Sequence, residues 1–135
     1  MGQASSLSTQ ARLRRKLSRA MPVAVKEVDM LTNDERKALE SLKNMISRKY
    51  KLIDFILYGS KASGRDTEES DIDVMVELEE ESRDARWDIY SMAAEVNMGF
   101  GCVISPILFS RRELEEGPMD ESPIYRRIAA EGVRI

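Results

Sequence analysis

Apolar residues first recur at helical spacing in the stretch that begins near Thr32. The apolar positions on this stripe are Leu39, Leu42, Met45 and Ile46. Residues three and four apart lie on one face of a helix, so this spacing predicts an amphipathic helix. Thr32 and Glu35 are three residues apart and predict a capping box at its start. We expect the helix to end near Tyr50.

Two strands are predicted after this helix. Residues 52–58, LIDFILY, are rich in branched and aromatic side chains and end at Gly59, a pattern typical of a buried strand. Residues 71–78, DIDVMVEL, alternate polar and apolar side chains and predict a second strand with one polar face. The polar face would hold Asp71, Asp73, Met75 and Glu77. Between the strands, residues 59–70 predict a turn with one helical turn inside it.

The later part of the chain continues to alternate helices and strands. Residues 84–98 predict a helix closed by Gly99 and Gly101. Its core stripe would be Trp87, Tyr90, Ala94 and Met98. Residues 102–109 predict a third strand, and Pro106, which lacks an amide donor, places that strand at an edge or a bulge.

The C-terminal stretch predicts a short helix, a second helix after Ser122, and a terminal strand. Alternating strands and helices indicate an α/β (α+β) fold with a small mixed sheet of three or four strands, flanked by helices.

Composition narrows the chemistry available to this fold. The chain has 135 residues, room for one domain, which we assign to residues 30–135. It contains no histidine and one cysteine, Cys102, which excludes an internal disulfide, histidine-dependent triads and histidine-ligated zinc. Any metal must therefore be held by oxygen. A net charge of −3 argues against a protein that coats nucleic acid.

Residues 1–29 form a basic tail that we expect to be flexible. The opening Gly2 and Ser6 match a myristoylation pattern. The same basic tail is also explained by a solvated arm, or by an upstream extension that precedes a true translation start at Met21 or Met30. No apolar run approaches the ~18–20 residues of a membrane span, and no secretory signal is evident, so we expect a soluble cytoplasmic protein.

The candidate chemistry lies at the ends of the first two strands. Residues two apart on a strand share a face, so the carboxylates of Asp71 and Asp73 project together. Magnesium is usually held by one or two carboxylates together with substrate phosphates. Gly59 leaves room for a phosphate, and Ser60 can offer its hydroxyl and amide to it. The two motifs together predict a phosphate and metal site.

These motifs resemble those of the minimal nucleotidyltransferases of the DNA polymerase beta superfamily. Their signature is Gly-Ser at the end of a strand, about ten further residues, and Asp-x-Asp in the next strand; here the sequence is LYGSKASGRDTEESDIDVMV. The resemblance spans roughly residues 31–135. It implies the nucleotidyltransferase fold, with Gly59 and Ser60 binding ATP or another nucleoside triphosphate. Asp71 and Asp73 would be the catalytic residues and would hold Mg²⁺ or Mn²⁺.

Two departures from the family pattern affect the predicted site. The family often has a basic residue where Ser63 stands, and here Lys61 and Arg65 are the candidate phosphate ligands; both also fit ordinary solvated loop bases. Catalytic members carry a third carboxylate on a later strand. The corresponding stretch, residues 102–109, has no acid and offers only Ser105. Since that acid helps to activate the attacking hydroxyl, we expect binding to outlast catalysis.

The resemblance implies transfer of a nucleoside monophosphate to a hydroxyl of a protein or small molecule. Members of the family are often antitoxins paired with a helical HEPN-domain ribonuclease toxin, so an antitoxin that acts by contact or by adenylylating its toxin is an alternative. A nucleotide-binding pseudoenzyme is another. The short chain places the acceptor on a partner or at an interface with a second copy, and direct binding of nucleic acid is not expected.

Other conspicuous residues have ordinary structural explanations. The acidic run Glu77, Glu79, Glu80 and Glu81 predicts a solvated loop, although Glu77 shares the face of Asp73. Cys102 fits a small buried hydrophobe.

Overall fold

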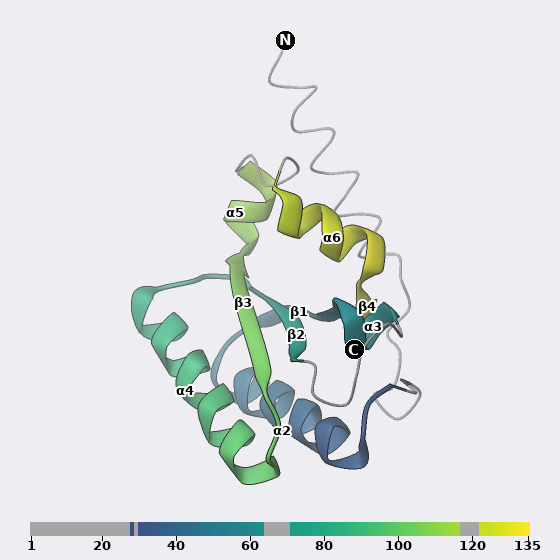
Figure 1. The fold of residues 1–135 in the computed structure, drawn as a ribbon. Coiled ribbons are helices and arrows are strands. Elements are labelled where there is room, and N and C mark those ends of the chain that lie inside the picture. Colours follow the sequence, from purple (N-terminus) through teal and green to yellow (C-terminus); the bar gives the residue numbers. More distant parts are fainter. Residues whose placement is uncertain (1–27, 29, 64–70, 117–121) are drawn as a thin grey trace.

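Four strands form one mixed sheet in the order β3-β2-β1-β4 (Figure 1). They are β1 (Leu52–Tyr58), β2 (Ile72–Leu78), β3 (Ile104–Ser110) and β4 (Val133–Arg134). β1 is antiparallel to β2 and to β4, whereas β2 and β3 are parallel. The computed structural model describes residues 28, 30–63, 71–116 and 122–135. The predicted mixed sheet of three or four strands is confirmed.

Helices cover both faces of the sheet (Figure 1). The long helices α2 (Asn33–Lys49) and α4 (Arg83–Phe100) lie on one face. The shorter α5 (Arg111–Glu116) and α6 (Pro123–Glu131) lie on the other. The single turn α3 (Ser60–Ser63) follows β1. Among the described residues, no helix has the length and apolar character that crossing a membrane requires.

The apolar side chains of the sheet divide between two cores because successive residues of a strand face opposite ways. Beneath α2 and α4, branched side chains of the three long strands, such as Leu57, Val74 and Leu108, pack against the helices. The second core, beneath α5 and α6, contains Ile56, Tyr58, Met75, Phe109, Leu114, Tyr125 and Ile128. The site described below lies on this second face.

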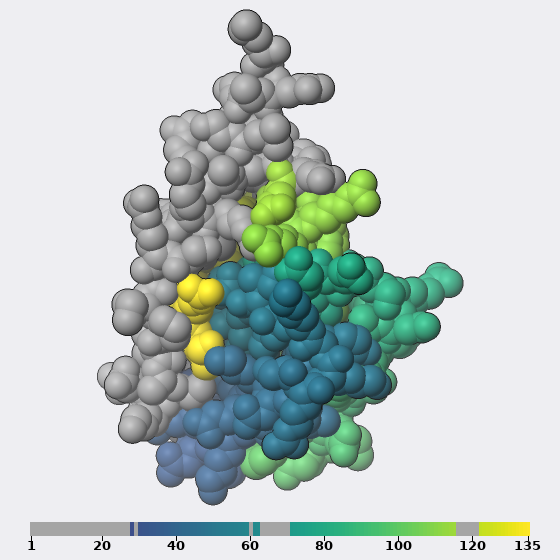
Figure 2. All heavy atoms as spheres, turned by 180° about the vertical axis from the view of Figure 1, so that it is seen from behind, coloured from purple at the N-terminus to yellow at the C-terminus, as the bar shows by residue number. Residues whose placement is uncertain are grey.

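The N-terminus of α2 has the predicted capping box. The Glu35 amide donates to Thr32 Oγ1 at 3.1 Å, and the Thr32 amide donates to Glu35 Oε1 at 2.9 Å. Tyr50 caps the other end, as predicted. From behind, α2 in blue lies beside the yellow C-terminal residues (Figure 2). Lys43 of α2 is hydrogen-bonded to the C-terminal residue, since its Nζ donates to the carbonyl of Ile135 at 2.7 Å.

β3 is an edge strand, as Pro106 predicted. Its outer side is covered in part by side chains. Asn97 bonds both backbone groups of Ile104: its Nδ2 donates to the carbonyl at 3.1 Å, and its Oδ1 accepts from the amide at 2.8 Å. At the other end, the Ser110 amide donates to Glu113 Oε1 at 3.1 Å. The pairing of β3 with β2 runs unbroken past Pro106.

The prediction that Glu77 lies in a solvated loop is wrong, because Glu77 is a buried residue of β2. Met75 and Glu77 are 0% and 2% exposed. Glu77 belongs to the strand and not to an acidic loop. It is buried because α5 and α6 cover this face of the sheet. The alternation itself is correct, but it reports which residues share a face and not what covers that face.

The predicted core stripe of α4 is also wrong. Trp87, Tyr90 and Met98 are 67%, 37% and 87% exposed. The buried side chains are instead Ala85, Ile89, Met92, Ala93 and Val96. The two alanines let α4 lie close to its neighbours, whereas the larger stripe points outward. The helix itself and its end at Gly101, which has φ +66°, agree with the prediction.

Candidate functional site

Asp73 lies near the start of β2, between β1 and β3. Across one ladder its Cα partner is Tyr58, and across the other it is Ser105. Residues paired in register point to the same face of a sheet. The structure therefore brings the Asp73 carboxylate, the Tyr58 phenol and the Ser105 hydroxyl onto the face that α6 partly covers. Asp71, just before the strand, is exposed.

Gly59 approaches the Asp73 carboxylate closely. A Cβ built on Gly59 would lie 2.6 Å from Asp73 Oδ2, a separation that real Cβ atoms do not adopt. The backbone of Gly59 also has φ +78°, in the left-handed region that favours glycine. Glycine is thus required here for the turn and for the approach of Asp73. The predicted Gly-Ser and Asp-x-Asp motifs do meet in space.

Arg127 of α6 was not predicted and lies at the same place. Its Nη2 would be 3.4 Å from the same Cβ position on Gly59. Its side chain is 50% exposed, and its Nε pairs with Glu131 Oε2 at 3.3 Å. No local sequence pattern reports this contact, because Arg127 and Asp73 belong to elements far apart in the chain.

The electrostatics of the site favour a bound cation. Burial raises the pKa of Asp73, and the negative charge of Asp71 raises it further, against the lowering effect of Arg127. Burial, followed by the charge of Asp73, also raises the pKa of Tyr58. Two carboxylates that share a face repel each other, and a divalent cation removes that repulsion. The donor set therefore fits Mg²⁺ held by Asp71 and Asp73 together with a phosphate.

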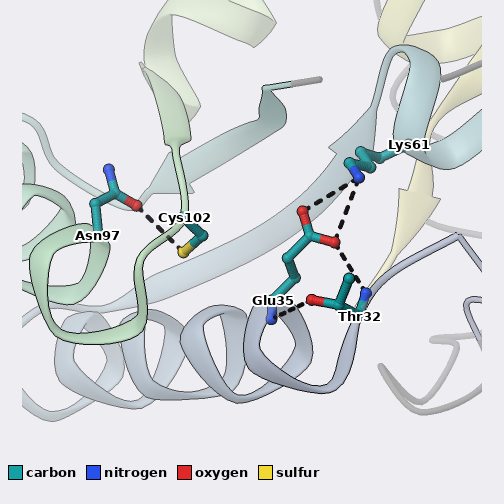
Figure 3. A network of polar contacts seen from close by, with 5 residues as sticks. All are labelled: Thr32, Glu35, Lys61, Asn97 and Cys102. Carbon is teal, nitrogen blue, oxygen red and sulfur yellow. Dashed lines mark hydrogen bonds and ion pairs between the residues drawn. The ribbon is translucent and has the colours of Figure 1, made fainter. Parts of the chain in front are cut away.

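Lys61 is placed differently from the prediction of a phosphate ligand. It is 1% exposed, and its Nζ lies 3.3 Å from Glu35 Oε1 and 3.2 Å from Oε2 (Figure 3). The same Glu35 carboxylate accepts from the Thr32 amide, so one buried acid joins the start of α2 to α3. A phosphate contact by Lys61 would have to displace this pair. Ser60 begins α3, next to Gly59, and Arg65 lies outside the described residues.

The third carboxylate of the family pattern is not replaced by an acid on β3. Ser105 occupies the position directly beside Asp73. Across residues 28, 30–63, 71–116 and 122–135, no group of three or more acidic, histidine or cysteine side chains is arranged to hold a metal ion. Cys102, close to the start of β3, is half-buried, and burial raises the pKa of its thiol.

Comparison with known proteins identifies the class to which this site belongs. Residues 40–105 match the family model described as "Polymerase beta, Nucleotidyltransferase". The matched segment includes both the Gly-Ser turn and the Asp-x-Asp strand. The chain therefore contains a minimal nucleotidyltransferase domain of this family.

Two individual proteins are similar to this chain. A protein of Methanocaldococcus jannaschii, named as a candidate protein adenylyltransferase, is 47% identical over 45 residues, which are 33% of this chain and 45% of that protein. A crystal structure of a toxin-antitoxin with AMP-PNP has a TM-score of 0.49 and 17% identity, covering 76% of this chain and 72% of that one. A structural likeness of this degree says nothing of function.

Proposed function

We propose that this protein binds Mg-ATP, or another nucleoside triphosphate, and transfers the nucleoside monophosphate to a hydroxyl group. The observation that carries the proposal is the meeting of Gly59 and Asp73. A carboxylate that lies against a side-chain-free turn, at the end of two strands, suits a triphosphate and the cation it carries.

Asp71 and Asp73 would hold Mg²⁺ or Mn²⁺, which supplies positive charge to the triphosphate when bound. The amides at Gly59 and Ser60 would orient the phosphates. In the reaction, the acceptor oxygen forms a bond to the α-phosphorus, and the bond from that phosphorus to the bridging oxygen breaks. Pyrophosphate leaves with the bonding electrons, and the hydroxyl proton passes to a base or to solvent.

The acceptor is a protein hydroxyl in this proposal. The name of the archaeal relative, a candidate protein adenylyltransferase, supports a protein acceptor and AMP as the transferred group. An antitoxin that adenylylates a HEPN-type toxin is the version of this function we favour. The gene next to that of this protein is a simple check, since a helical HEPN protein encoded there would support it.

A second candidate function is a nucleotide-binding antitoxin that neutralises its partner by contact, without transfer. Ser105 favours it, because a neutral side chain stands beside Asp73 where a third carboxylate would assist the attacking hydroxyl. The two functions share the nucleotide site and differ in turnover.

Incubation with labelled ATP and cell lysate separates these functions. The wild type should label a protein in the presence of Mg²⁺, and the double variant Asp71→Asn, Asp73→Asn should not. ATP binding without labelling would support the contact antitoxin. If the wild type binds no nucleotide with Mg²⁺ by calorimetry, both functions are refuted.

A further inference from the structure

We infer that Arg127 is a ligand of the triphosphate, an assignment that rests on the proposed function. Arg127 belongs to α6, outside both sequence motifs of the site. Its Nη2 and Asp73 Oδ2 lie 3.4 and 2.6 Å from one point, the Cβ position of Gly59. The Arg127 guanidinium thus lies where Asp73, the proposed metal ligand, meets the turn at Gly59 that is proposed to bind the phosphates.

The charges of the site call for such a cation. Asp71 and Asp73 are both acidic, and a triphosphate adds several negative charges. One divalent ion held by two carboxylates leaves the triphosphate unneutralised. The neutral Ser105 gives no third carboxylate for a second metal ion. A guanidinium beside Asp73 supplies positive charge to the phosphates without a second metal ion.

Arg127 is chemically suited to this contact and is able to make it. A guanidinium presents five donors in a planar fork that matches phosphate oxygens, and it stays charged at all physiological pH values. Its present partner is Glu131, in an exposed pair of a kind that contributes little to stability. Exchanging Glu131 for a phosphate therefore costs little. Lys61, the base predicted from the sequence, is instead buried against Glu35.

The test compares three variants on one helix by calorimetry. Arg127→Gln removes the guanidinium charge, and Arg127→Lys keeps a charge but loses the fork. The matched control is Arg126→Gln, an exposed arginine one residue away on α6. Each protein is titrated with ATP, ADP and AMP in the presence of Mg²⁺, and thermal melting verifies that each variant is folded.

Arg127→Gln should weaken ATP binding by roughly tenfold to a hundredfold, the usual range for a lost hydrogen bond to a charged group. AMP, which lacks the β- and γ-phosphates, should change by less than about threefold. Arg127→Lys should fall between, and Arg126→Gln should match the wild type.

Three results would overturn the assignment. ATP affinity unchanged in Arg127→Gln would show that the guanidinium does not reach the phosphates. An equal loss for ATP and AMP would show that Arg127 acts only by supporting Asp73 or the fold. An equal loss in Arg126→Gln would show a general effect of charge. If the wild type binds none of the nucleotides, the proposed function itself fails, and this assignment fails with it.

Discussion

Replacing Lys61 by methionine tests how the Gly-Ser turn is supported. The methionine side chain has about the same length and no charge, so Lys61→Met leaves the Glu35 carboxylate buried without its ammonium partner. The side chains of Lys61 and Glu35 are 1% and 9% exposed, so water cannot take the place of that partner. Glu35 also accepts from the Thr32 amide, which ties its position to the start of α2.

The expected loss is large for a domain of this size. Removing one partner of a buried ion pair typically costs about 3–5 kcal/mol. Domains of this kind have total stabilities of only about 5–15 kcal/mol. Lys61→Met should therefore lower the melting temperature by about 10 °C or more. The double variant Glu35→Gln, Lys61→Met buries no charge, and glutamine can still serve the capping box. Its loss should be smaller than the two single losses added together.

Urea unfolding followed by circular dichroism measures these free energies. The matched control is Lys49→Met, since Lys49 also pairs with an acid, Asp88, but its side chain is 61% exposed. That variant should change stability little, as is usual for exposed pairs. If Lys61→Met behaves like Lys49→Met, the Lys61–Glu35 pair is not held in the interior. If it keeps full stability but loses ATP affinity, Lys61 is a phosphate ligand after all.

Three further substitutions probe the site itself. Gly59→Ala should lower stability by about 1–2 kcal/mol because residue 59 has a positive φ. It should also weaken Mg-ATP binding by displacing the Asp73 carboxylate. Unchanged affinity by calorimetry would contradict the close approach of Gly59 to Asp73. Asp73→Asn should raise the melting temperature at pH 7 while reducing Mg²⁺ binding. Because the pKa of Asp73 is raised in the folded protein, its charged form opposes folding above pH 3.8, and this effect disappears at lower pH, where the carboxyl is protonated in both the folded and the unfolded state. A lower melting temperature of the variant at pH 7 would refute this reasoning. Ser105→Asp should increase nucleotidyl transfer on the order of a hundredfold by adding a third carboxylate beside Asp73, whereas rapid pyrophosphate release by the wild type would show that the base comes from elsewhere.

Much of the fold could be predicted because its signals are local. The capping box of Thr32 and Glu35, the apolar run of β1 and the glycine end of α4 each depend on residues close together in the chain. The errors arose where burial depends on what packs from elsewhere. Glu77 lies on the face predicted to be polar, but helices from the C-terminal part of the chain cover it.

Only those residues of the site that belong to the Gly-Ser and Asp-x-Asp motifs could be predicted from the sequence. The motifs bring Gly59 and Asp73 together, since β1 and β2 are neighbouring antiparallel strands and the end of β1 lies beside the start of β2. Arg127 could not be found this way, because it reaches the site through the packing of α6 on the sheet. The burial of Lys61 could not be predicted either, because it depends on a contact with a residue far away in the chain. A lysine in a polar loop normally faces water, and its burial depends on Glu35, which no local pattern connects to it.

The outer edge of β3 affects how copies of this protein behave at high concentration. An exposed strand edge invites pairing with another chain, which leads to aggregation. Here the Ile104 amide is taken by Asn97, Pro106 has no amide to offer, and the Ser110 amide is taken by Glu113. The donors of alternate residues, which would recruit a foreign strand, are thus blocked at three places along β3. These contacts leave β3 with fewer amides open to another strand, which reduces the tendency of this edge to pair with a second copy of the chain.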